Sequence, residues 1–296
     1  MRHGVVLLPE HRWRDAEERW RLVERLGYHH AWTYDHLMWR WFAGRRWFGA
    51  VPTLAAAATA TRSVALGILV ATPNFRHPVT LAKDLVTLDD IAGGRLVCGL
   101  GAGAPGPDDG ILGQPPVPGR PGRTGRFEDF VELLDEVLVR GDVDRTTSSF
   151  SAVGLTFHPR AGAGRRTPFA IAATGPRGMA LAARFGEYWV TSGPPGDFRA
   201  RPLAEVVPVV REQIRKLVTT CERAGRDPST LRRLFVADAA AGGVTASVAA
   251  YEDAVGVLES LGITDLVVHW PRPDQPYQGD ERVLADFAEK NLAGRT

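Results

Sequence analysis

The chain has 296 residues, of which 44% are hydrophobic and 24% charged, and its formal net charge is only +2. This is the composition of a globular protein, and the scattered arginines give no basis for nucleic acid as a partner. No stretch approaches the ~18 consecutive apolar residues of a membrane-spanning helix, and the first apolar run is too short for a signal peptide. We therefore expect no membrane partner. The two cysteines lack the spacing of a metal site and are expected to be reduced thiols in a cytoplasmic protein.

Short apolar or β-branched runs alternate with longer helical patterns along the whole chain. Their periodicity predicts eight strands, at residues 3–8, 29–33, 64–71, 96–101, 169–173, 188–191, 233–238 and 265–270. It also predicts eight helices, at 15–26, 51–61, 79–92, 128–139, 178–185, 203–224, 246–261 and 281–292. Residues 104–124 are rich in glycine and proline and are expected to form a long loop, and 146–157 to form a hairpin insertion.

Strands that alternate with helices pair in parallel through right-handed crossovers. Eight such units in one chain favour a closed (β/α)₈ TIM barrel, with loop insertions, that forms a single domain over residues 1–296. A doubly wound open sheet is the main structural alternative. In a barrel the chemistry gathers where the strands end, so the residues after each strand are the candidates for function.

Four of the eight tryptophans lie in residues 31–47, around the polar end of the second predicted strand. That strand ends in Asp35-His36, where an imidazole could donate or accept a proton near neutral pH. We expect Trp32 to pack in the barrel, while Trp39, Trp41 and Trp47 are alternatives for a pocket wall that receives a flat ligand. The same rings could instead be core residues.

A metal site that uses His36 and His269 is conceivable. Metal-dependent barrel hydrolases usually carry a His-x-His pair after the first strand, where this chain has Leu8-Pro9-Glu10. We therefore expect no metal. The pair His29-His30 stands at the start of the second predicted strand and is expected at the bottom of the barrel or exposed.

Two glycine-rich segments follow predicted strands. Gly99 to Ala104 formally match the G-x-G-x-x-G/A dinucleotide fingerprint, but Pro105 and Pro107 prevent the helix that this fingerprint requires. The remaining interpretations are a bare backbone that a planar ligand approaches closely, or a loop hinge. The segment 174–178, with Arg177, is either an anion site at a helix N-terminus or an ordinary helix start with Pro176 first.

Three segments taken together resemble the bacterial luciferase-like flavin-dependent superfamily, and more narrowly its branch that uses the deazaflavin coenzyme F420. The matching segments are AWTYDHL at 31–37, LGILVATPNFRHPVTLAKDLVTLDDIAGGRLVCGLGAG at 66–103, and AATGPRGMALAARFGEYWVTSG at 172–193. The resemblance spans about residues 3–193, and the last third agrees only in its alternation of strands and helices. It implies a TIM barrel, a small-molecule substrate and, because such proteins often form dimers, a homodimer.

The resemblance also implies roles for individual residues. His36 would be the catalytic proton donor or acceptor, and a bulge with a cis peptide at Leu69-Val70 would lie beneath the ring. The cofactor would be bound by Asp35, Leu69, Val70, Thr72, Ala102, Gly103, Gly175, Pro176 and Gly178, with its phosphate at the last three. The substrate would meet Trp39, Trp41, Thr191 and Ser192.

Two departures from the family bear on the substrate. Members that oxidise sugar phosphates carry a glutamate where this chain has Ala104, and lysines for the phosphate, whereas this chain has only Lys83, Lys216 and Lys290. This argues against a sugar phosphate. The aromatic loop after His36 favours an apolar or aromatic substrate instead.

The expected function is an oxidoreductase that moves a hydride between F420 and an organic substrate, with His36 as the proton carrier. The nearest alternative is an FMN-dependent monooxygenase that uses molecular oxygen, although Asp-His rather than Glu-His at 35–36 favours F420. A flavin-binding barrel without turnover and a metal-dependent hydrolase are the other hypotheses.

Overall fold

The computed structural model describes residues 1–106, 108–113, 117, 119–159, 166–194, 201–237 and 243–293; the predicted strand end at Asp238 lies outside them. Eight parallel strands form a closed barrel in the order β1-β10-β9-β8-β7-β4-β3-β2, which confirms the predicted fold. They are β1 (Arg2–Val6), β2 (His30–Thr33), β3 (Ala65–Ala71), β4 (Leu96–Gly101), β7 (Phe169–Ala172), β8 (Tyr188–Thr191), β9 (Arg232–Ala237) and β10 (Asp265–His269).

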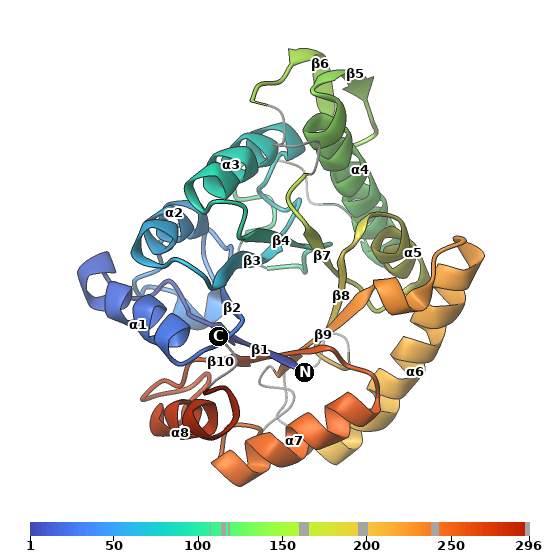
Figure 1. The fold of residues 1–296 in the computed structure, drawn as a ribbon. Coiled ribbons are helices and arrows are strands. Elements are labelled where there is room, and N and C mark those ends of the chain that lie inside the picture. Colours follow the sequence, from blue (N-terminus) through green and yellow to red (C-terminus); the bar gives the residue numbers. More distant parts are fainter. Residues whose placement is uncertain are drawn as a thin grey trace.

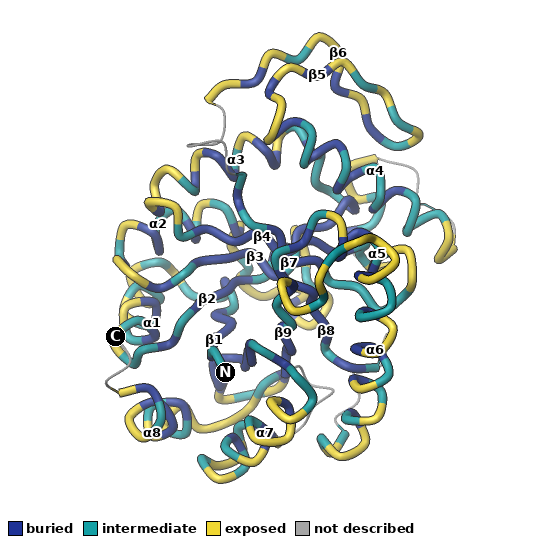
Figure 2. Tube along the Cα trace, turned by 45° about the vertical axis from the view of Figure 1, so that its right-hand side comes forward, coloured by how far each residue is buried: buried dark blue, intermediate teal, exposed yellow. Residues whose placement is uncertain are grey.

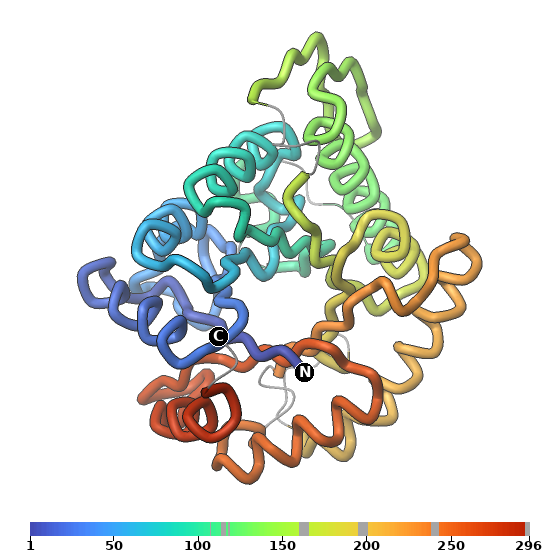
Figure 3. Tube along the Cα trace, in the orientation of Figure 1, coloured from blue at the N-terminus to red at the C-terminus, as the bar shows by residue number. Residues whose placement is uncertain are grey.

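Within the described residues, eight α-helices surround the barrel as an outer ring (Figure 1). They are α1 (Trp13–Arg25), α2 (Ala50–Ala60), α3 (Pro78–Ile91), α4 (Gly119–Arg140), α5 (Pro176–Phe185), α6 (Leu203–Arg223), α7 (Val248–Ser260) and α8 (Arg282–Asn291). Short 3₁₀ turns occur at Arg40–Phe42 and Pro228–Thr230. The chain runs once around the ring, which brings its first strand beside its last (Figure 3). Among the described residues, no helix has the length and apolar character that crossing a membrane requires.

The strands are buried, and the exposed residues follow the outer sides of the helices and the hairpin β5 (Asp142–Thr146) and β6 (Ser151–Thr156) (Figure 2). This antiparallel hairpin confirms the predicted insertion, but its first strand begins at Asp142, ahead of the predicted range 146–157. One large apolar cluster lies between the strands and the helices. A smaller cluster, drawn mainly from alternate strand residues such as Val6, Trp32, Val97 and Val267, fills the barrel interior. Trp32 therefore packs in the barrel as predicted.

The predicted loop over 104–124 is wrong at its end, because α4 begins at Gly119 rather than at residue 128. Proline is tolerated in a first helical turn, where its missing N–H would have no partner within the helix. The guanidinium of Arg177 on α5 also holds this turn, since it donates to the Pro121 carbonyl (3.3 Å) and to the Glu128 carboxylate. Residues 119–124 are therefore helical, although their glycine and proline content predicted a loop.

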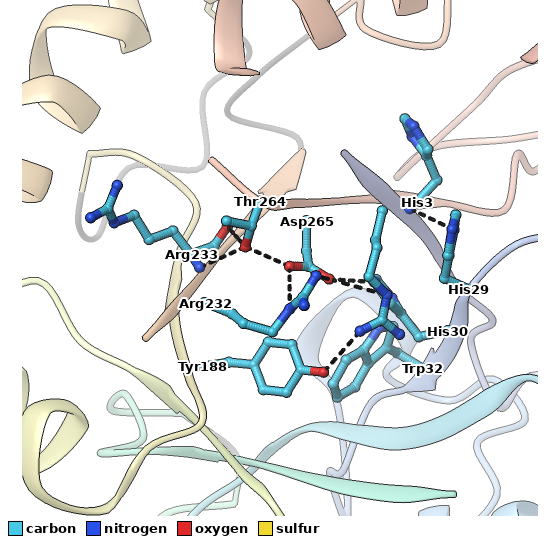
Figure 4. A network of polar contacts seen from close by, with 10 residues as sticks. His3, His29, His30, Trp32, Tyr188, Arg232, Arg233, Thr264 and Asp265 are labelled. Atoms are coloured by element: carbon cyan, nitrogen blue, oxygen red, sulfur yellow. Dashed lines mark hydrogen bonds and ion pairs between the residues drawn. The ribbon is translucent and has the colours of Figure 1, made fainter. Parts of the chain in front are cut away.

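Polar side chains close the bottom of the barrel, at the N-terminal ends of the strands (Figure 4). The fully buried Asp265 accepts hydrogen bonds from Arg232 Nε (3.0 Å) and Thr264 Oγ1 (2.6 Å), and lies 3.2 Å from His30 Nε2. Trp32 Nε1 donates to His30 Nδ1 over 2.7 Å. An indole nitrogen only donates, so His30 carries its proton on Nε2 and donates to Asp265. His30 thus lies at the bottom of the barrel, as predicted.

Burial determines the charge states of this pair. It lowers the pKa of His30 below the ordinary value, although Asp265 acts in the opposite direction. Burial alone would raise the pKa of Asp265, but hydrogen bonds from His30 and Thr264 and the charge of Arg232 outweigh it and lower that pKa to about 2. The pair is therefore a neutral imidazole beside a carboxylate whose main cationic partner is Arg232.

Glycines in β4 make room for an irregularity in β3. The Leu69–Val70 peptide bond is cis, and the register of β3 against β4 shifts between Ile68 and Ala71. A Cβ on Gly99 would lie 2.3 Å from the Ile68 carbonyl oxygen, and one on Gly101 would lie 2.6 Å from Val70 Cγ2. The glycine pattern is thus explained by the bulge of the neighbouring strand, and no dinucleotide fingerprint is needed.

Candidate active site

A cavity of about 1390 Å³ opens at the C-terminal ends of the strands. Its wall contains nearly every residue that the sequence nominated for cofactor or substrate: His36, Trp39, Trp41, Leu69, Val70, Thr72, Ala102, Gly103, Gly175, Pro176, Gly178, Thr191 and Ser192. These positions span more than 150 residues of sequence and meet only because parallel strands end at the same side of the barrel. The volume exceeds that of a typical small-ligand pocket, which leaves room for a cofactor and a substrate together.

Asp35 is the exception, because it does not line the cavity. Its carboxylate is 2% exposed and accepts hydrogen bonds from Arg76 Nε (2.9 Å) and Nη2 (2.7 Å). Burial disfavours the charge of Arg76, but Asp35 and then Asp84 more than offset it and raise the pKa of Arg76. The carboxylate of Asp35 is thus engaged with the loop after β3, and its expected contact with a cofactor ring stays a prediction.

His36 has a buried carboxylate partner that sequence reasoning missed. Its Nδ1 lies 2.6 Å from Oδ2 of Asp108, and the other oxygen, Oδ1, accepts from the Met38 N–H (2.8 Å). Asp108 is 4% exposed and belongs to the loop between β4 and α4. With Nδ1 engaged by the carboxylate, His36 has Nε2 as its remaining ring nitrogen for proton exchange. Nothing local distinguishes Asp108 from its neighbour Asp109.

The aromatic loop after β2 forms one side of the cavity. Trp39 is stacked on Phe42, with centroids 5.4 Å apart, and lies nearly parallel to His36 at 6.2 Å. Trp41 is 49% exposed at the rim, and Trp47 Nε1 donates to the His36 carbonyl over 3.0 Å. Trp39 and Trp41 thus line the cavity, whereas Trp47 supports the His36 backbone.

The opposite end of the cavity suits an anion. Helix α5 begins at Pro176 after Gly175, and no side chain caps its N-terminus, so the N–H groups of its first turn are available to a ligand. Arg177 is not the free cation that the sequence suggested, because Glu128 neutralises it. Arg120 and Arg123 of α4 line the same cavity, and in the described part of the structure their guanidinium groups have no hydrogen bond or ion pair.

A metal ion has no prepared set of ligands among the described residues, where no three His, Cys, Asp or Glu side chains are grouped to hold one. His269 instead lies 2.7 Å from the hydroxyl of Tyr34 and is stacked on Tyr277. Tyr34 and Tyr277 line the cavity but were not nominated from the sequence. Tyr34 could have been found by alternation, since it points the same way as His30 and Trp32 on β2.

Curated proteins that resemble this chain include two oxidoreductase types. An F420-dependent glucose-6-phosphate dehydrogenase from Beutenbergia cavernae is 34% identical over 175 residues, which are 58% of this chain and 51% of that protein. A 4-hydroxyprotoasukamycin monooxygenase from Streptomyces nodosus subsp. asukaensis is 32% identical over 193 residues, 62% of this chain and 48% of that protein. The matches therefore span about half the length of these relatives.

Among solved structures, the coenzyme F420 dependent tetrahydromethanopterin reductase from Methanopyrus kandleri superposes with a TM-score of 0.77 over 99% of both chains, at 17% sequence identity. At that identity the likeness supports the fold. The family model described as luciferase-like monooxygenase matches residues 1–261, which confirms the resemblance noted in the sequence. The chain belongs to the luciferase-like monooxygenase family.

Proposed function

We propose that this protein is an F420-dependent oxidoreductase that acts on an apolar or aromatic organic substrate. The observation that carries the proposal is the composition of one cavity. It combines a proton-carrying imidazole, the Leu69–Val70 bulge, and an anion-binding end made of an uncapped helix and two arginines. The relatives that use F420 add support from sequence.

The residues present fit a deazaflavin with an anionic tail. Backbone at Ala102 and Gly103 and the Leu69–Val70 bulge form part of the cavity wall, where a flat ring can approach closely. Gly175 has no atom within 4 Å of where a Cβ would be, so the wall is open at that position as well. A phosphate would be held by the first turn of α5, with Arg120 and Arg123 beside it. Bound there, the cofactor supplies hydride chemistry that no side chain provides.

The protein's own part is to orient the reactants, exclude water and hold a proton. Trp39 and Trp41 would cover an apolar substrate on the side of His36. The Nε2 atom of His36 would donate or accept the proton that accompanies hydride transfer, while Asp108 holds the ring in place. Removal of the imidazole in His36→Ala should lower kcat by about 10²- to 10⁴-fold and leave cofactor affinity unchanged. Normal binding with unaltered turnover would exclude His36 as the proton carrier, whereas cofactor binding by the wild type without any turnover would favour a non-catalytic barrel.

FMN is the second candidate, because a relative is a monooxygenase. Titration of the purified protein with F420 and with FMN, followed by absorbance and fluorescence, separates the two. We expect F420 to bind more tightly, since its tail carries carboxylates beyond the phosphate, whereas FMN ends at the phosphate. Tight FMN binding without affinity for F420 would overturn the proposal.

The anion-binding end can be tested separately with Arg123→Ala. Loss of one charge-assisted hydrogen bond of ~1.5 kcal/mol should weaken F420 binding about tenfold. The matched control is Arg140→Ala, at the far end of the same helix, where the guanidinium pairs with Glu136 in solvent. Equal effects of the two variants would contradict the assigned role of Arg123.

A further inference from the structure

We propose that Tyr34 and His269 form a second proton-transfer pair at the cavity, separate from His36 and Asp108, which would receive the proton of a substrate hydroxyl group. Tyr34 directly follows β2, and His269 is the last residue of β10. The Tyr34 Oη atom lies 2.7 Å from His269 Nε2, a short and strong contact for these groups. This inference rests on the proposed function, because the hydride needs the F420-type acceptor.

The backbone determines which nitrogen of His269 carries the proton. Its Nδ1 lies 3.3 Å from the Ala237 carbonyl oxygen, and a carbonyl only accepts. The proton is therefore on Nδ1, and Nε2 accepts from the Tyr34 hydroxyl. His269 is 4% exposed and lies behind Tyr34, which itself lines the cavity. Tyr34 is thus positioned between the ligand space and a buried base.

Tyr277 holds the imidazole ring in this orientation. The two rings are stacked with centroids 3.6 Å apart and an interplanar angle of 4°. Tyr277 is also the one non-glycine residue with a positive φ (67°) within the described ranges of the chain. That left-handed conformation is unfavourable for a bulky residue and is kept where the surroundings require it. The Tyr277 hydroxyl lies 3.3 Å from that of Tyr34, so the cavity wall is built around this pair.

The pair suits the oxidation of an alcohol. An oxidised deazaflavin bound in the cavity would supply the acceptor for the hydride of the carbinol carbon. The substrate oxygen would give its proton to Tyr34 Oη, and the proton of Tyr34 would pass at the same time to His269 Nε2, so that the alcohol becomes a carbonyl compound and the imidazole an imidazolium. Run backwards, the same atoms reduce a carbonyl group. The Tyr34 and His36 rings lie 6.2 Å apart, so the two pairs can serve different atoms of the reaction. Tyr34 would take the proton of the substrate oxygen, and His36 would give the proton that a deazaflavin ring takes up together with the hydride.

Two matched variants test the pair. Tyr34→Phe removes only the hydroxyl that contacts His269. Tyr188→Phe is the matched control, because it removes a hydroxyl at the bottom of the barrel, where that group accepts from Arg2 Nη1 over 3.2 Å. With 1-phenylethanol as the probe and F420 as acceptor, we expect Tyr34→Phe to lower kcat at least about 100-fold, with Tyr188→Phe within about threefold of wild type. F420 affinity should be unchanged in both.

A measurement without cofactor separates this inference from the proposed function. In protein labelled with ¹⁵N-histidine, with His269 assigned by loss of its signals in His269→Gln, Tyr34→Phe should shift the Nε2 resonance and leave Nδ1 protonated. An unchanged Nε2 resonance overturns the pair, whatever the cofactor. F420 binding with no turnover of the probe, or full turnover by Tyr34→Phe, overturns its role in alcohol oxidation. Failure to bind F420 overturns the proposed function, and with it the hydride step assigned here.

Discussion

Two polar pairs lie at opposite ends of β2 and β10, four residues apart, and they differ in what surrounds them. At the bottom, His30 of β2 meets Asp265 of β10, and at the top, Tyr34, which directly follows β2, meets His269 of β10. Alternation along a strand points both members of each pair inward, with Trp32 and Val267 between the two levels. At the bottom every partner is another protein group, whereas at the top the hydroxyl borders a cavity. The same register thus supports stability at one end and offers chemistry at the other.

The largest expected difference between the two ends concerns stability. Asp265→Asn removes the buried charge that Arg232 and His30 share, and breaking such a pair costs about 3 kcal/mol. Urea unfolding should therefore show a much lower midpoint with an unchanged slope. F420 affinity of the folded protein should stay close to wild type, because the site is at the opposite end. A loss below about 1 kcal/mol would show that the bottom network is not what stabilises the barrel.

At the top, a carboxylate should matter for rate and hardly for stability. Asp108→Asn keeps the shape of the side chain but removes the charge that holds His36 Nδ1. We expect kcat to fall about 10- to 100-fold with the KM for F420 unchanged. Asp109→Asn is the control, since the carboxyl group of Asp109 is next to Asp108 in sequence and makes no described hydrogen bond to His36. If both variants lose activity equally, general loop damage rather than the dyad is responsible.

Acid should weaken the bottom pair in a predictable direction. The folded-state pKa of His30 is lowered from the ordinary value of 6.5. Just below that pH, the imidazole of His30 is therefore protonated in the unfolded chain and still neutral in the folded protein. Stability therefore falls as the pH drops below that value, by at most about 1.4 kcal/mol per pH unit for one proton. The depressed pKa of Asp265 removes further stability only as the pH falls from about 4 toward about 2. In His30→Gln the slope near pH 6 should be smaller, and an unchanged slope would exclude His30 as its source.

The smallest expected effect is that of Tyr34→Phe on stability. One hydrogen bond at the wall of an open cavity contributes about 1 kcal/mol or less, so the unfolding midpoint should move little. Urea unfolding of Tyr34→Phe and Asp265→Asn under the same conditions compares how much each pair contributes to the free energy of unfolding. A loss as large as that of Asp265→Asn would make the two ends energetically alike.

Local patterns were sufficient for the barrel and for most of the cavity wall. Strand and helix periodicities repeat within a few residues, so eight units could be counted, and parallel strands end at one side whatever lies between them. That is why Thr72, Gly103, Pro176 and Ser192 could be nominated together. The start of α4 was missed because proline and glycine composition resembles a loop, and only the contact with Arg177 reveals the helix.

The partners of the side chains were decided by tertiary structure. Asp35 pairs with Arg76, 41 residues away, and His36 pairs with Asp108, 72 residues away. The bond between Tyr34 and His269 spans 235 residues, because closing the barrel places β10 on one side of β1 and β2 on the other. A sequence by itself specifies which residues stand at strand ends, through their spacing. Which of them share a proton depends on how the strands and loops fold together, since a hydrogen bond acts over about 3 Å regardless of distance along the chain.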